Sequence, residues 1–299
     1  MSPRSHNRSS PVLHRAFCFA LVAWALPTVW GQAPGYRPAP NYITNGQADQ
    51  AEGARLLKEF QGAGIAGDYW LGFELRVMPR QGAERTVAGE IFGTRNDRGP
   101  LTRIIFPGSA NTKSWLMQGG PEPSLWVSDS SSRTSAARSV TGDGLMEPID
   151  GNPGTDITPF DLQMPFRYWT DFIYEGLTRV RGRPAHSFVL YPPASFTAAS
   201  RGLAGVRILV DSQFQALVQA ELLGTNKSAE KTITILDLKK LGEHWIPKEI
   251  DFRNNLTRGK TRFTVTAAGL DLALAGDVFE PGRLGSPPPP VPADKIQHL

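Results

Sequence analysis

Apolar residues recur with two different spacings along the chain. In the segment 47–64, Leu56, Leu57 and Phe60 fall on one stripe with Ala54 beside it, which predicts an amphipathic helix. From Asp68 onward the period becomes two, as expected for a half-buried strand. The side chains expected on one face of that strand are Tyr69, Leu71, Phe73, Leu75 and Val77.

The two-residue period then continues through most of the chain. Gly, Pro, Asn and Asp separate the apolar stretches at roughly ten-residue intervals, the spacing of an antiparallel meander. The further strand candidates are residues 86–94, 101–108, 112–118, 124–129, 172–180, 185–192, 205–211, 215–223, 231–238, 243–253 and 260–268. About a dozen strands of this kind predict a mainly β fold, either a large curved sheet or a barrel.

Three stretches fall outside this pattern. Residues 32–46 form a Pro/Gly-rich linker, and residues 285–299 form a Pro-rich C-terminal tail that is expected to be extended. Residues 128–144 make a polar loop longer than usual between strands, which is typical of a mobile or a functional segment. We therefore predict one domain over residues 47–284.

The first 31 residues have the features of an export signal. Arg4, Arg8 and Arg15 precede the apolar run 16–26, and Gly31 offers a small residue for cleavage. Eleven apolar residues are too few to cross a bilayer as a helix, which needs about 20. We expect a periplasmic protein cleaved near Gly31.

Removal of this signal changes the charge balance. The chain has 32 basic and 28 acidic residues, and three arginines but no acids lie in residues 1–31, which leaves 29 against 28. Because the remaining chain is near neutral and has no Lys/Arg cluster interleaved with aromatics, no nucleic-acid partner is expected.

Few side chains suited to catalysis or metal binding remain. The single cysteine, Cys18, lies in the signal, and the histidines beyond it, His186, His244 and His298, have no other ligand at a metal-like spacing. Motifs for a nucleophile elbow, a zinc protease, a P-loop or a dinucleotide turn do not occur in the sequence. We predict no metal site, no cofactor and no enzymatic activity.

Two aspartates in "GTDITPFDL", residues 154–162, admit two interpretations. Asp156 and Asp161 could be the carboxylate pair of a polysaccharide-active enzyme. Alternatively, Thr158 caps a short helix, Pro159 takes its first position and Asp161 its third, while Asp156 accepts backbone N–H bonds in the preceding turn. Capping is favoured because it explains the threonine and the proline as well.

The same stretch resembles the G-S-D-F-T-Y-E-D-L signature of outer-membrane lipoprotein-sorting proteins, the LolA-like superfamily. Gly154, Asp156, Thr158, Asp161 and Leu162 are identical to it. Further similarity follows in "VRGRPAHSFVLYPP", "VRILVD", "EHWIPKEIDFRN" and "DLALAGDVFEPGRL", so the resemblance spans about residues 154–284.

The resemblance implies a half-open antiparallel β-barrel of about 11–12 strands, with a few short helices covering an apolar concave face. It also implies a carrier that shields acyl chains of lipoproteins, or a related phospholipid, and sorts them to the outer membrane between donor and acceptor proteins. An envelope-stress sensor or a protein-interaction module on the same scaffold is the alternative.

Strand alternation suggests which side chains would line the implied cavity, although aromatic residues in a filled core give the same pattern. The residues predicted to contact a ligand are Leu71, Phe73, Leu75, Ile91, Ile105, Trp115, Trp126, Phe166 and Trp169.

Overall fold

The computed structural model describes residues 48–107, 112–129, 136–196, 202–226 and 228–299. The chain divides into two compact units, residues 1–35 and 36–299, and all described residues belong to the second. The predicted signal, 1–31, and the predicted linker, 32–46, lie outside the described residues. No helix in the described part of the chain is long and apolar enough to cross a membrane.

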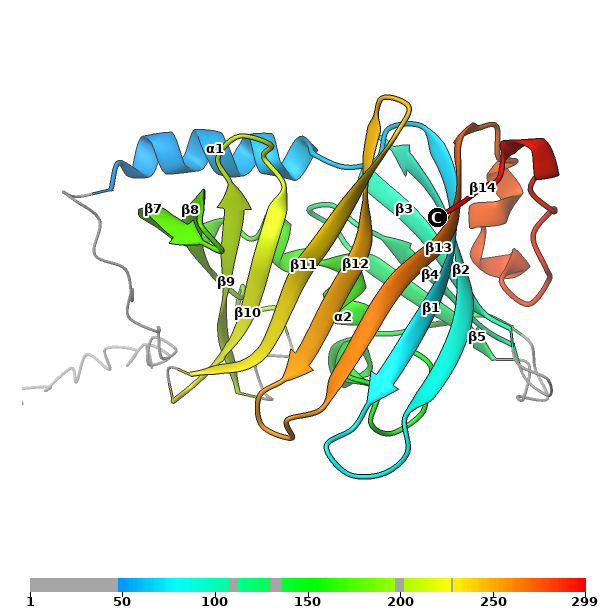
Figure 1. Cartoon of the computed structure of the whole chain (residues 1–299), viewed down its shortest axis with the longest axis horizontal. Coiled ribbons are helices and arrows are strands. Elements are labelled where there is room, and N and C mark those ends of the chain that lie inside the picture. The colour runs from blue at the N-terminus through cyan, green and yellow to red at the C-terminus, as the bar shows by residue number, and fades with distance from the viewer. Residues whose placement is uncertain (1–47, 108–111, 130–135, 197–201, 227) are drawn as a thin grey trace, which may run out of the picture. The chain divides into compact units, whose positions relative to one another are not determined.

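The described residues build one antiparallel sheet of 14 strands (Figure 1). Its strands are β1 Asp68–Met78, β2 Arg85–Asn96, β3 Gly99–Phe106, β4 Lys113–Gln118, β5 Ser124–Asp129, β6 Arg138–Ser139, β7 Asp171–Val180, β8 Arg183–Tyr191, β9 Leu203–Asp211, β10 Leu217–Gly224, β11 Ala229–Leu241, β12 His244–Asn254, β13 Lys260–Leu272 and β14 Gln297–His298.

The strand order explains why the sheet is open. Strands β1 to β6 run outward from the middle as a meander, the chain crosses to the far edge, and β7 to β13 return until β13 pairs with β1. Strands β6 and β7 therefore form the two edges and are not paired with each other. The predicted half-open, mainly β fold is confirmed. The 14 strands exceed the expected 11–12 because they include β6 and β14, which have only two residues each.

Short helices accompany the sheet. They are α1 Gln50–Gly62, α2 Pro159–Gln163, and the 3₁₀ helices η1 Gly142–Met146, η2 Pro165–Tyr168, η4 Gly276–Phe279, η5 Pro281–Arg283 and η6 Ala293–Lys295. The predicted first helix is confirmed, since Leu56, Leu57 and Phe60 of α1 are buried. A Cβ on Gly53 would lie 2.4 Å from the Cβ of Tyr174, so glycine permits α1 to approach β7 this closely.

The apolar side chains divide between the two faces of the sheet. One large cluster fills the inner, concave face and includes the buried residues of α1 and alternate residues of the strands. A smaller cluster lies on the outer face, where Phe92, Ile105 and Leu116 pack against Val278, Phe279 and Leu284 of the C-terminal segment.

The C-terminal segment is attached to the sheet by a buried arginine. Arg103 of β3 donates 3.1 Å to the carbonyl of Val278 and 3.3 Å to that of Leu284, and it also contacts the carbonyl of Ser286. The Pro-rich residues 287–290 line a pocket with Arg103, and β14 pairs with β13. The stretch 285–299, expected as an extended tail, thus lies against the outer face of the sheet.

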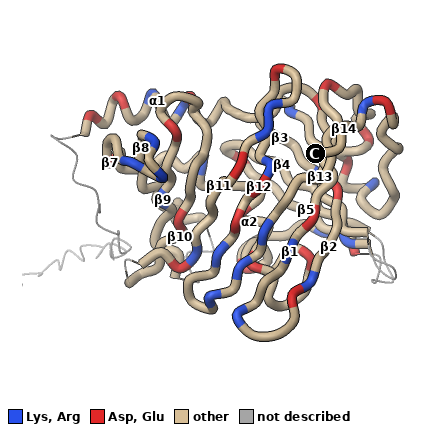
Figure 2. Tube along the Cα trace, in the orientation of Figure 1, with Lys and Arg blue, Asp and Glu red and all other residues tan. Residues whose placement is uncertain are grey.

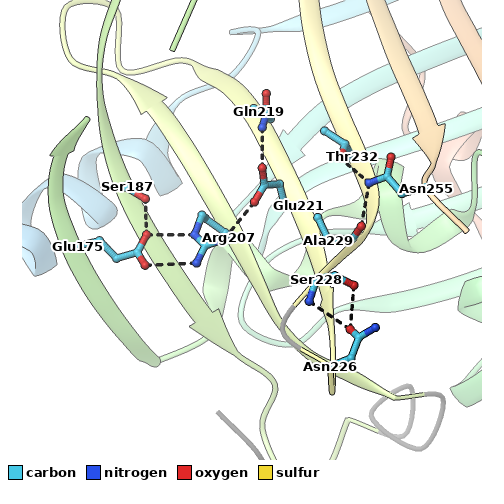
Figure 3. Close-up of polar contacts among 10 residues, drawn as sticks. All are labelled: Glu175, Ser187, Arg207, Gln219, Glu221, Asn226, Ser228, Ala229, Thr232 and Asn255. Atoms are coloured by element: carbon cyan, nitrogen blue, oxygen red, sulfur yellow. Dashed lines mark hydrogen bonds and ion pairs between the residues drawn. The ribbon is translucent and has the colours of Figure 1, made fainter. Parts of the chain in front are cut away.

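Polar side chains on four neighbouring strands form a network near the β7 edge (Figure 3). Glu175 of β7 accepts from the Ser187 hydroxyl at 2.5 Å and from Arg207 Nε at 3.1 Å, and Arg207 Nη1 donates to Glu221 of β10 at 3.1 Å. Elsewhere, basic and acidic positions are mixed along β11 and β12 (Figure 2), and Arg262 of β13 pairs with Asp251 of β12 at 2.7 Å. Such pairs between strands favour a single register.

Candidate functional site

The segment that joins the two sheet edges crosses the concave side. It runs from β6 through η1, α2 and η2 to β7, and α2 lies behind β11 and β12 in Figure 1. Its apolar side chains, Ile149, Ile157, Phe160, Phe166 and Trp169, are buried in the same cluster as the inner residues of the strands. We call residues 140–170 the crossing segment; it covers the concave face with its own side chains.

The helix α2 within this segment has the predicted cap. Thr158 is the N-cap in an extended conformation and Pro159 occupies the first turn. The carboxylate of Asp161 accepts from the N–H and from the hydroxyl of Thr158, both at 2.8 Å. Met164 ends the helix with a left-handed φ of 48°, directly before Pro165. The capping interpretation of Thr158, Pro159 and Asp161 is confirmed.

A distant lysine completes the environment of Asp161. Lys231 of β11 contacts Asp161 Oδ2, and this carboxylate is 0 % exposed. An ion pair withdrawn from water in this way depends on its hydrogen bonds, because each charge has lost its hydration. The pair therefore joins the crossing segment to the sheet.

The turn before α2 differs from the prediction at Asp156. Its N–H donates to the Thr261 hydroxyl at 2.9 Å. Its side chain does not accept the expected backbone bonds: Oδ2 is buried without a hydrogen-bond partner among the described residues. A long-range contact to β13 thus replaces the local turn, and it leaves a carboxylate oxygen unsatisfied.

Asp156 lines a pocket of about 770 Å³ where the crossing segment meets the hairpin turns at one end of the sheet. The polar lining includes Arg80, Thr158, Glu230, Lys231, Asn254 and Thr257. The apolar lining includes Met146, Pro148, Leu203, Leu222 and Leu256. Since Leu203 and Leu222 are also members of the inner core cluster, the pocket reaches from a polar rim to the apolar interior.

Burial raises the pKa of Asp156 above its usual value. The positive charge of Lys231 and hydrogen bonding with the side chains of Asn254 and Thr261 oppose this rise, and the charge of Asp161 adds to it. A carboxyl whose pKa is raised on folding binds a proton more readily in the folded chain, so its ionised form costs stability at neutral pH. This cost disappears as the pH falls through the raised pKa toward the usual 3.8.

Asp156→Asn is accordingly expected to stabilise the protein at pH 7, with a gain that shrinks as the pH is lowered toward 4. Urea unfolding across that range would measure it. Asp251→Asn is the matched control, because hydrogen bonds from Arg262 and the charge of Lys260 outweigh burial and hold the pKa of Asp251 below its usual value. That control should lose stability at pH 7, and a loss in both variants would contradict the expectation for Asp156.

Several hydrogen bonds hold the crossing segment in place. Trp115 Nε1 donates to the carbonyl of Ile149 at 2.8 Å, and Gln163 Nε2 donates to the carbonyls of Gln118 and Ser124 at 3.0 Å each. Arg167 donates to carbonyls at the end of α1, among them that of Phe60 at 2.6 Å. The crossing segment is therefore hydrogen-bonded to α1 and to strands β4 and β5.

The structure distributes the predicted ligand-contacting residues over both faces. Seven lie together in the inner cluster: Leu71, Phe73, Leu75, Ile91, Trp115, Phe166 and Trp169. Ile105 belongs to the outer cluster and Trp126 packs against it, so neither faces the concave side. All seven inner residues are packed in the core, and the pocket is lined instead by residues that strand alternation did not single out, such as Leu203 and Lys231.

His186 and His244 each lie beside a polar side chain outside the pocket. His186 Nδ1 lies 2.8 Å from the Tyr174 hydroxyl, and His244 Nε2 lies 3.1 Å from Asp271 Oδ1. Within the described ranges, no group of three or more His, Cys, Asp or Glu side chains is placed to hold a metal ion.

Comparison with known proteins identifies the fold. No family model matches the chain, and no curated protein matches its sequence. A DUF1329 family protein from Desulfovibrio piger has a similar structure, with a TM-score of 0.66 and 14% identity over 78% of this chain and 98% of that one.

Two further solved structures are similar. An outer membrane lipoprotein-sorting protein domain from Vibrio parahaemolyticus has a TM-score of 0.64 and 14% identity over 78% of this chain and 97% of that one. A LolA superfamily protein from Nitrosomonas europaea has a TM-score of 0.56 and 14% identity over 76% and 96%. The LolA-like fold expected from the signature is confirmed.

Proposed function

We propose that this protein is an exported carrier that binds an acyl chain of a lipoprotein or of a phospholipid and acts in the periplasm. One observation carries this proposal: a pocket of about 770 Å³ runs from a polar rim to Leu203 and Leu222 of the apolar core. Its volume lies within the usual range of small-molecule sites, about 300–1,000 Å³. A rim that is wet and an interior that is apolar suit an amphiphile.

The energetics favour an acyl chain as the ligand. Each buried methylene contributes about 0.8 kcal/mol. Because the crossing segment fills the concave face, a long chain has to displace some of its side chains, and Phe160, Phe166 and Trp169 are the apolar groups that it would replace. We infer that the crossing segment acts as an internal cover that exchanges its own aromatic contacts for those of the ligand.

The similar folds support this proposal in part. Lipoprotein sorting is the role named for the Vibrio parahaemolyticus domain. Applied to this chain, that role predicts delivery to the outer membrane with donor and acceptor proteins as partners. The signal expected in residues 1–31 is consistent with periplasmic action. The polysaccharide-active alternative is disfavoured because the Asp161 carboxylate is bonded to the helix cap and to Lys231.

A protein-interaction module is the second candidate, and one surface favours it. Phe214 and Trp245 are 51% and 53% exposed, and their ring centroids lie 6.3 Å apart. They line a second pocket of about 440 Å³ with Arg183 and Asp211. Neighbouring exposed aromatic rings are typical of a surface that binds a protein.

Binding of a fluorescent long-chain fatty acid to protein purified without detergent tests the two candidates. Met146 is half-buried in the pocket wall, so Met146→Glu is expected to weaken binding about tenfold or more, as a charge at the apolar contact would. Leu177→Glu is the control, because Leu177 is 52% exposed on β7. Binding that survives Met146→Glu but is lost on Trp245→Glu would reject the pocket as the acyl site.

A further inference from the structure

The pocket contains one buried carboxylate, Asp156, for which no ion pair is seen among the described residues. Of the two buried aspartates of this turn and helix, Asp161 is paired with Lys231, whereas Asp156 forms no ion pair in the described part of the chain. Asp156 is 9 % exposed, lines the pocket and has Oδ2 without a hydrogen-bond partner among the described residues. A buried acceptor of this kind is costly unless a donor reaches it.

The backbone opposite Asp156 leaves space beside this carboxylate. A Cβ on Gly259 would lie 3.0 Å from Asp156 Oδ2 and 3.3 Å from the Thr257 hydroxyl. Gly259 and Thr257 both line the pocket, and the absence of a side chain at position 259 leaves this side of the Asp156 carboxylate open. A small donor group can therefore reach the carboxylate, whereas a side chain at position 259 would narrow the approach.

We propose that this pocket recognises a primary ammonium group, with Asp156 as its acceptor and counter-charge. An ammonium group supplies both the missing positive charge and the missing N–H donor, and charge-assisted hydrogen bonds are the stronger kind. The Leu203 and Leu222 wall continues from this point into the core and suits hydrocarbon attached to the group. As a statement about a lipid headgroup, the inference rests on the proposed carrier function.

The charge pattern favours an ammonium over an anionic headgroup. An anion beside Asp156 would meet a like charge, and the neighbouring cation in the lining, Lys231, is already bonded to Asp161. The exposed Arg80 lies at the rim, where a phosphate next to the ammonium could meet it. A quaternary ammonium has the charge but lacks the N–H donor, so it is expected to bind less well.

Soluble headgroup analogues test this inference without an acyl chain. Calorimetry should show that glycerophosphoethanolamine binds about tenfold or more tightly than glycerophosphocholine or glycerophosphoglycerol, as one charge-assisted hydrogen bond would give. Asp156→Asn should abolish the preference, and Gly259→Ala should weaken it while retaining the charge. Asp271→Asn, which changes a 75% exposed carboxylate, is the control.

The outcomes separate this inference from the carrier function. Equal binding of the three analogues, no binding of any, or a preference that survives Asp156→Asn would overturn the ammonium site, even where the fatty acid still binds. A preference that depends on Asp156, together with dihexanoyl-phosphatidylethanolamine binding more tightly than its deacylated analogue, identifies a lipid. The same preference without any gain from the acyl chains would support the site, assign it to a free amine and reject the carrier function.

Discussion

Lys231→Met is expected to lower the free energy of unfolding by about 3–5 kcal/mol, the usual cost of removing one partner from a buried ion pair. Asp161 is 0 % exposed, and its Oδ1 has no hydrogen-bond partner in the described residues even when Lys231 is present. Without the lysine, the two carboxylates Asp161 and Asp156 would face each other's charge with no cation to offset it. The loss should therefore exceed that of an ordinary hydrogen bond.

Urea unfolding at pH 7 measures this loss, with Lys260→Met as the control. Lys260 Nζ lies 3.4 Å from Asp251, but Arg262 Nε donates to the same carboxylate at 2.7 Å, so Asp251 keeps a cation in the control. The control should lose less than about 1 kcal/mol, as expected for a partly exposed pair. Equal losses in both variants would show that Asp161 is hydrated in solution and that the pair does not hold the crossing segment.

The helix α2 shows which contacts a sequence can predict. Thr158, Pro159 and Asp161 are neighbours in the chain, and the cap follows from geometry within four residues. Lys231 is 70 residues away from Asp161, and no local pattern relates the two. The same limit explains Asp156, whose predicted turn was replaced by a bond to Thr261, 105 residues away.

Strand faces were predictable only where polar and apolar residues alternate. In β1, the alternation correctly placed Leu71, Phe73 and Leu75 on one face. In β3, the consecutive residues Ile104 and Ile105 face opposite sides of the sheet. Both are apolar because the C-terminal segment covers the outer face. Because both faces of this strand are buried, its sequence does not reveal which residue points inward.

The packing of the C-terminal segment on the outer face of the sheet was not predictable from composition. Proline-rich stretches are ordinarily solvated and extended, which led to the expectation of a tail. The segment is held instead by Arg103, a buried cation that donates to main-chain carbonyls. An arginine in the strand "LTRIIF" gives no sign in the sequence that its partners lie some 180 residues later.

Whether the concave face is filled or hollow also required the structure. Aromatic residues serve a packed core and a lipid site equally well, and the sequence of the crossing segment is consistent with both. Phe160 is 0 % exposed and its ring centroid lies 5.7 Å from that of Phe166, 6.3 Å from that of Trp169 and 5.5 Å from that of Phe196. The described chain thus closes its own interior with an aromatic cluster around Phe160.

Phe160→Ala is expected to cost about 3–5 kcal/mol of stability, as removal of a fully buried phenyl ring does, because the ring's contacts are lost and a cavity remains. An apolar cavity of that size stays dry and takes up small apolar molecules. Benzene should therefore raise the melting temperature of the variant and leave the wild-type protein unchanged, with about 1.4 kcal/mol of stabilisation at ten times the dissociation constant.

Phe214→Ala is the control for this variant, because Phe214 is 51% exposed in the turn between β9 and β10 and its loss should cost about 1 kcal/mol or less. If the crossing segment exchanges its aromatic contacts for an acyl chain, Phe160→Ala should also bind the fluorescent fatty acid more tightly, since fewer internal contacts have to be given up. A destabilised variant whose fatty-acid affinity is unchanged would show that the ligand does not displace this cluster, and the acyl chain would then be confined to the pocket beside Asp156.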